Sequence, residues 1–192
     1  MLSRAGGVSA HYLIPKQGNE VYQLVEELKR AWHAGRSQWQ SVNQLNYSSI
    51  GIEIVSLGYQ VDKHGKPIRD KHGSHIWYPF EEQQIDLVIA LAKDIVQRYN
   101  ILPTRVVGRS DISPDRKLDP GALFLWKKLH DHGIGAWPNP EDVQAIEQDL
   151  STHMAIASLQ ENFKKYGYDV AETGILDAQT KSVVNQPFIC TL

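Results

Sequence analysis

Apolar and polar residues alternate in three stretches of the first third of the chain, which is the pattern of half-buried β-strands. The stretches are residues 8–14, 20–25 and 50–55. In the third stretch Ile52 lies on one face together with the other isoleucines, and Glu53 lies on the opposite face. The first two stretches are separated by a short turn, as in a hairpin. The chain is therefore expected to open inside a β-sheet.

A helical period replaces the alternation at Glu81. Apolar side chains recur at helical spacing over 81–99, and Asn100 follows as a stop signal. A short buried strand is expected at Val106 and Val107, and a second helix over 121–132. A helix that follows the strands in this way is expected to pack on the sheet.

Two prolines within 136–140 mark a boundary, because they make a semi-rigid connector. Beyond it, amphipathic helices are expected over 141–150 and 155–166, and Asp177 is a suitable N-cap for a third. These patterns predict an α/β fold, with a central mixed β-sheet flanked by helices and a small C-terminal three-helix module. The expected domains are residues 1–135, a linker at 136–140 and the module at 141–192.

Composition mainly argues against certain partners and structural features. The 192 residues carry a net charge of −2, so no basic footprint indicates a nucleic-acid partner. No apolar run reaches the roughly 20 residues of a membrane span. The first 15 residues lack the apolar core of a signal peptide, which predicts no export signal in the chain as written. Cys190 is the only cysteine, so no internal disulfide is expected.

Charged residues and prolines crowd the segment 106–121, which reads V-V-G-R-S-D-I-S-P-D-R-K-L-D-P-G. A rigid charged loop after a strand is typical of a functional site, although a solvated turn gives the same pattern. Upstream, Trp32 and His33 favour either a loop held by its aromatic residues or the wall of a groove for sugars and peptides. Glu53 either faces water or faces a cleft as a general base.

Histidines elsewhere are less informative. His11 lies alone on a strand and is expected to be structural rather than a ligand. The polar stretch 58–79 contains His64, His72 and His75, but their spacing does not fit a metal site. This stretch is expected to be a surface loop that could border a substrate groove.

The 106–121 segment resembles the signature of the zinc-dependent N-acetylmuramoyl-L-alanine amidases, V-V-G-H-S-D-I-A-P-x-R-K-x-D-P-G. In that family the His and the last Asp hold zinc, and the Lys faces the scissile carbonyl. The resemblance therefore implies a catalytic role for Lys117 and a metal-binding role for Asp119. Arg109 occupies the position of the family's zinc-binding His.

Two further segments support the resemblance. R-A-W-H-A-G recurs in these amidases beside the substrate, which implies substrate-binding roles for Trp32 and His33. Arg116 is assigned to substrate binding with them. The segment S-I-G-I-E is shared as well, and there the Glu activates the zinc-bound water, so the resemblance implies that Glu53 is a catalytic residue.

The tail is similar to a small three-helix peptidoglycan-binding module. Gly167, Tyr168, Thr173, Gly174 and Asp177 are among the matches to its G-Y-x-V and T-G-x-L-D motifs. The last residues depart from that module, because Pro187 ends the helix early. The alternative interpretation of the tail is a helical bundle that only covers one side of the main domain.

The resemblance implies an enzyme that hydrolyses the amide bond between N-acetylmuramoyl and L-alanine. It further implies zinc as cofactor, peptidoglycan or muropeptides as partner, a monomer, and a place in the cell envelope, whereas the chain as written would be cytoplasmic. The family's first zinc-binding His lies on a strand upstream of residues 8–15, and nothing here matches its motif. With two of three ligands absent, tight zinc binding is not expected.

Two other interpretations therefore stand beside hydrolysis. One is a catalytically inactive relative that still binds muropeptides. The other is a truncated or frame-shifted translation that lacks the first strand. In either case the Arg109 guanidinium is expected to pair with Asp119, filling the metal position with a positive charge.

Overall fold

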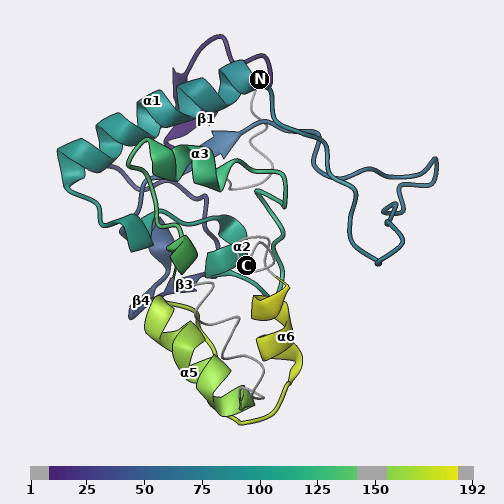
Figure 1. The fold of residues 1–192 in the computed structure, drawn as a ribbon. Helices are drawn as coiled ribbons and strands as arrows, with labels where there is room; N and C mark the ends of the chain where they lie inside the picture. The colour runs from purple at the N-terminus through teal and green to yellow at the C-terminus, as the bar shows by residue number, and fades with distance from the viewer. Residues whose placement is uncertain (1–8, 142–154, 186–192) are drawn as a thin grey trace.

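The computed structural model in Figure 1 describes residues 9–141 and 155–185. Its main sheet has three strands in the order β2-β1-β5. These are β1 (Tyr12–Ile14), β2 (Tyr22–Gln23) and β5 (Ile52–Ile54). β1 pairs antiparallel with β2 and parallel with β5, where Leu13 lies opposite Glu53. The predicted mixed sheet and α/β class are confirmed, although each strand is shorter than its sequence pattern.

The long helix α1 (Glu82–Tyr99) covers this sheet, as the helical period predicts. Its buried stripe includes Ile85, Val88 and Ile89, which pack with Ile14 of β1 in one core. A buried glutamine fixes the docking, since Gln84 Nε2 donates to the carbonyls of Pro15 at 3.1 Å and Val55 at 2.8 Å. One side chain thus ties the helix to two strands.

Two predictions downstream of α1 are wrong in detail. Val106 and Val107 form no strand, because they link the 3-10 helix η2 (Pro103–Arg105) to α2 (Arg109–Ile112) and leave no length for pairing. The helix predicted over 121–132 begins only at α3 (Trp126–Asp131). Gly121 has φ +91°, a left-handed conformation that no helix contains, so the chain must turn before α3 starts.

A small hairpin was not predicted from the sequence. β3 (Gln38–Trp39) pairs antiparallel with β4 (Val42–Asn43), and the 3-10 helix η1 (Leu45–Tyr47) follows. Strands of two residues are too short to show an alternation. The hairpin buries the Trp39 indole, whose Nε1 donates to the Thr104 carbonyl at 2.8 Å.

The C-terminal part contains α5 (Ile156–Tyr166) and α6 (Ala178–Val184). Both helices agree with the prediction, and Asp177 caps α6 by accepting from the Thr180 amide. The helix predicted over 141–150 falls outside the described residues from position 142 onward. Along the ranges that the structure covers, no helix is long and apolar enough to cross a membrane.

α5 and α6 share a hydrophobic core with the first part of the chain, and Figure 1 shows α5 close below the β3–β4 hairpin. Trp39 is enclosed by Tyr166 and Tyr168, with ring centroids 5.6 and 5.0 Å away. Gly167 leaves room for this indole, since a Cβ there would lie 2.7 Å from a ring atom. The tail is therefore built into the main core.

Candidate functional site

The charged segment 106–121 is anchored by a buried aspartate. Asp111 lies in the single helical turn α2, where its Oδ2 accepts from the Gly108 amide at 2.7 Å and its Oδ1 from the Tyr168 hydroxyl at 2.8 Å. Burial raises the pKa of Asp111, against the opposing effect of these two hydrogen bonds. The carboxyl group thus fixes the turn that carries Arg109, and this was not predicted from the sequence.

Arg109 and Asp119 form the expected ion pair. Arg109 Nη1 lies 3.5 Å from Asp119 Oδ2, and both side chains are partly exposed, by 30% and 49%. The backbone holds the two ends of the segment together, since the Ser110 amide donates to the Asp119 carbonyl at 2.9 Å. The guanidinium therefore lies against the carboxylate that the resemblance assigns to zinc.

His33 packs on the backbone of Gly51, where a Cβ would approach its ring to 2.3 Å. Burial lowers the pKa of His33, and the nearby His11 and Arg109 lower it further. Within residues 9–141 and 155–185, His33 Nε2 and Arg109 Nε are buried without hydrogen-bond partners. His33 Nε2 can accept a hydrogen bond, and Arg109 Nε can donate one.

His11 is structural, as expected. Its side chain is buried, its Nδ1 accepts from the Gly51 amide at 3.0 Å, and its Nε2 contacts the Lys29 carbonyl at 2.9 Å. Both ring nitrogens are thereby used. This histidine orients the segment that supports His33 and leaves no lone pair for a ligand.

Glu53 projects from the middle of β5 on the same side as Gly51, because alternate residues of a strand share a face. That side is the one on which His33 packs. The Glu53 side chain is exposed, and its role as a general base stays a prediction. An exposed carboxylate beside His33 is accessible to water and to a substrate.

The other predicted site residues Trp32 and Lys117 differ in exposure and in their contacts. Trp32 is 45% exposed and stacks on the Arg30 guanidinium, which lies 4.1 Å from its ring and 4.4 Å from that of Tyr47. This three-residue stack was missed, although Arg30 and Trp32 are close in sequence. Lys117 is half-buried, and no ion pair involving it occurs among the residues that the structure places.

Arg116 links two backbone segments through hydrogen bonds, and the sequence did not indicate this role. Its Nη2 donates to the carbonyls of Ala34 and Arg36 and, at 2.8 Å, to Ser113 Oγ. Gly35 leaves space for this guanidinium, since a Cβ there would lie 3.2 Å from Nη2. Arg116 therefore joins the segment containing His33 to the segment containing Asp119. Its substrate-binding role stays a prediction.

The residues at this site do not fit a zinc ion. Zinc in a hydrolase needs about three protein ligands and one open position. Across the two described ranges, no group of three His, Cys, Asp or Glu side chains is placed to hold a metal. Arginine keeps its proton and has no lone pair to offer, so Arg109 repels a cation from the position beside Asp119.

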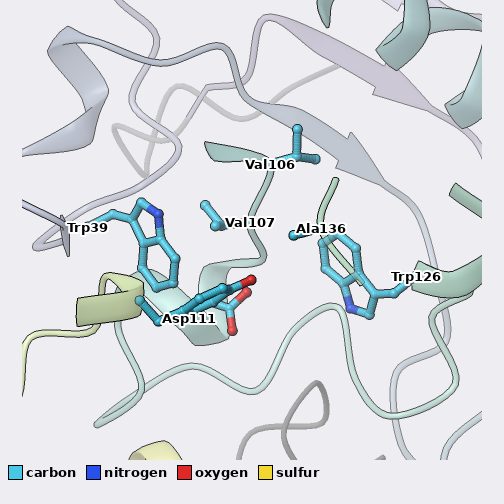
Figure 2. Close-up of a pocket in the computed structure, with 7 residues that line it drawn as sticks. Trp39, Val106, Val107, Asp111, Trp126 and Ala136 are labelled. Atoms are coloured by element: carbon cyan, nitrogen blue, oxygen red, sulfur yellow. The ribbon is translucent and has the colours of Figure 1, made fainter. Parts of the chain in front are cut away.

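A small cavity lies between Trp39 and Trp126, and Figure 2 shows Asp111 of α2 and Val107 at its wall. Its volume is about 10 Å³, roughly that of one water molecule. The cavity is too small for a sugar or peptide. On the exposed side of the segment, Glu53 and the Arg109–Asp119 pair are accessible.

Comparison with known proteins shows the family. A family model described as N-acetylmuramoyl-L-alanine amidase matches residues 2–122. The chain is 43% identical to N-acetylmuramoyl-L-alanine amidase AmiD of Escherichia coli over 171 residues, which are 85% of this chain and 59% of AmiD. It is 34% identical to 1,6-anhydro-N-acetylmuramyl-L-alanine amidase AmpD of Enterobacter cloacae, covering 64% of this chain and 56% of AmpD.

Solved structures show the same fold. The structure of E. coli AmiD with anhydro-N-acetylmuramic acid-L-Ala-D-γ-Glu-L-Lys has a TM-score of 0.76 at 39% identity, covering 93% of this chain and 69% of that one. Pseudomonas aeruginosa AmpDh3 with anhydromuramic pentapeptide has a TM-score of 0.79 at 38% identity, covering 94% and 72%. The chain spans somewhat more than half the length of the two curated amidases.

Proposed function

The chain belongs to the N-acetylmuramoyl-L-alanine amidase family, and from this premise we propose that it acts on muropeptides, at the amide bond between N-acetylmuramoyl and L-alanine. The main support is the partly exposed Arg109–Asp119 ion pair, with Arg109 close enough to His33 to lower the pKa of its imidazole. The relatives AmiD and AmpDh3, whose structures contain anhydro-muropeptides, support the same class of ligand.

Hydrolysis, the reaction named by the family, is the first candidate. Water adds to the carbonyl carbon and the C–N bond breaks, which leaves a muramoyl carboxylate and the free amine of L-alanine. Glu53 is exposed and can take the proton of the attacking water. Lys117 is a cation that can stabilise the charge developing on the carbonyl oxygen.

Binding without cleavage is the second candidate, and one observation favours it. The Arg109–Asp119 ion pair places a permanent cation where the family has a metal ligand. A guanidinium can donate hydrogen bonds to a carbonyl or carboxylate oxygen, but it does not lower the pKa of a water molecule as zinc does. Such a site recognises a muropeptide and leaves the amide bond intact.

One experiment separates the candidates. The purified chain is mixed with anhydro-muramoyl-L-Ala-γ-D-Glu-L-Lys, binding is followed by calorimetry, and release of free tripeptide is followed by mass spectrometry. Hydrolysis predicts release that Glu53→Gln lowers by roughly 10²–10⁴-fold, as for loss of a general base. Glu82→Gln, another exposed carboxylate, is the matched control and leaves release unchanged. Binding without release supports the second candidate. The absence of both binding and release would overturn the proposal.

The predictions for the C-terminal tail and for the place of the protein in the cell belong to the same proposal. Residues 141–192 are proposed to add affinity for peptidoglycan, supported by the G-Y-x-V and T-G-x-L-D matches. Action on peptidoglycan would place the protein in the cell envelope. Zinc, the monomeric state and the domain limits stay predictions.

A further inference from the structure

A tandem repeat in the polar stretch has no part in the site described above. Asp-Lys-His-Gly occurs at 62–65 and again at 70–73, eight residues later. In each copy the aspartate Oδ1 accepts two backbone amides of its own turn. Asp62 accepts from His64 and Lys66 at 2.8 and 2.9 Å. Asp70 does the same with His72 and Ser74 at the same distances. The two turns therefore have the same conformation.

Three backbone hydrogen bonds close these turns into a ring with the same eight-residue spacing. The amide of Gln60 donates to Ile76 at 2.8 Å, that of Ile68 to Gln60 at 2.9 Å, and that of Ile76 to Ile68 at 3.4 Å. Residues 59–77, here named the arm, thus carry an ordered scaffold. Figure 1 shows this part of the chain projecting away from the helices and the sheet.

The base of the arm is anchored close to the candidate site. The rings of Tyr59, His75 and Trp77 contact one another, with centroids 4.5 to 6.1 Å apart. Trp77 packs on Gly121, where a Cβ would lie 2.4 Å from its ring. Gly121 is two residues beyond Asp119 in the sequence. A polymer that reaches the site can therefore meet the arm as well.

The tips of the arm carry free positive charge. Lys63, Lys66 and Lys71 are exposed, and over residues 9–141 and 155–185 none of them forms an ion pair. Arg69 is exposed too, although its Nη1 donates to the Gly73 carbonyl at 2.6 Å. Each of the arm's two aspartates directs its Oδ1 to backbone amides of its own turn. The three lysines are exposed to solvent.

We propose that the arm binds the free carboxylates of stem peptides in polymeric peptidoglycan, so that the chain prefers the polymer to soluble muropeptides. The inference rests on the proposed function, because it takes muropeptides as the ligand of the site. A γ-linked glutamate, as in the peptide bound to AmiD, keeps its α-carboxylate free, so a polymer of such stems is a repeated anion. Exposed lysines on a projecting scaffold suit repeated, weak, salt-sensitive contacts.

The test compares polymer and fragment with one set of variants. The triple variant Lys63→Gln, Lys66→Gln and Lys71→Gln is measured for co-sedimentation with purified sacculi at low salt. The matched control is Lys29→Gln, Lys93→Gln and Lys127→Gln, three exposed lysines outside the arm and outside α5 and α6. Lys→Arg at the three arm positions keeps the charge. All variants are also titrated with anhydro-muramoyl-L-Ala-γ-D-Glu-L-Lys, and circular dichroism checks that they fold.

The inference predicts that the arm variant loses roughly tenfold in affinity for sacculi at low salt, since each exposed ion pair contributes little alone. The loss shrinks as salt rises, the control and arginine variants bind like the wild type, and affinity for the fragment is unchanged. Equal sacculus binding by wild type and arm variant would overturn the inference while leaving the proposed function intact.

Two other results are equally decisive. Binding of the wild type to neither sacculi nor fragment would overturn the proposed function, and the inference with it. Arm-dependent binding to phosphatidylglycerol vesicles in place of sacculi would show that the arm recognises a lipid surface, and it would contradict the proposal.

Discussion

Arg109 decides what kind of chemistry the segment 106–121 can perform. Its position in the motif predicted the ion pair with Asp119, and the 3.5 Å contact confirms it. The sequence did not indicate that Arg109 is close enough to His33 to lower the pKa of its imidazole. The place of His33 depends on Gly51, whose missing Cβ lets the imidazole approach β5.

The first prediction concerns zinc at this position. After dialysis against trace zinc, the wild-type chain should retain well below one zinc per chain, because a cation beside Asp119 meets the Arg109 charge. Arg109→His removes that charge and adds a ligand, so it should retain more zinc by elemental analysis. Adding Asp119→Asn to this variant should abolish the gain. Stoichiometric zinc in the wild type would show that another ligand set exists.

The burial of Asp111 could not be predicted from local sequence, because it depends on Tyr168, 57 residues away. A charged loop and a buried capping carboxylate look alike until the partner is known. Tyr168→Phe leaves Asp111 without this hydrogen bond and should lower the free energy of unfolding by about 1–3 kcal/mol. Urea denaturation measures the change. Tyr47→Phe, at a tyrosine that is 63% exposed, is the control. A loss as small as that of the control would show that the hydrogen bond contributes nothing.

Elements with a long, regular period were predictable, and short ones were not. α1 begins one residue after the predicted start and ends at the predicted residue, since 18 residues carry an unbroken apolar stripe. β3 and β4 have two residues each, so their existence depends on the burial of Trp39. Val106 and Val107 are apolar because they line the core and a small cavity.

The junction between β1 and α1 should make stability depend on acid pH. Glu27 accepts from both Nη atoms of Arg98 at 2.6 and 2.7 Å, and from the hydroxyls of Tyr12 and Tyr99. Above all the Arg98 hydrogen bonds lower the pKa of Glu27 to about 2. The unfolded chain takes up this proton near pH 4.5, and the folded chain does so only near pH 2.

Stabilisation by Glu27 is therefore complete above pH 4.5 and is lost as the pH falls toward 2. Glu27→Gln should be less stable than the wild type at pH 7, and the difference should shrink between pH 4.5 and 2. Chemical denaturation at several pH values measures this. Glu161→Gln, at an exposed carboxylate of α5, is the control. A difference that stays constant down to pH 2 would contradict the assigned partners.

At the scale of the whole molecule, the prolines at 136–140 predicted a boundary, but the residues beyond it share a core with the residues before it. Trp39 lies at the centre of that shared core, against Tyr166 and Tyr168. Trp39→Ala should therefore lower the free energy of unfolding by about 3–5 kcal/mol. In the wild type, unfolding should be a single transition by both tryptophan fluorescence and circular dichroism. Two separate transitions would show that the tail folds independently.

Muropeptides are proposed to bind on the surface formed by β5, the His33 segment and residues 109–119. An NMR titration of the isotope-labelled chain with anhydro-muramoyl-L-Ala-γ-D-Glu-L-Lys maps the binding surface residue by residue. We expect amide shifts at His33, Glu53, Arg109 and Asp119, and none in the open depression lined by Glu27, Leu28 and Arg98. Shifts confined to that depression, or no shifts at millimolar ligand, would contradict this proposal.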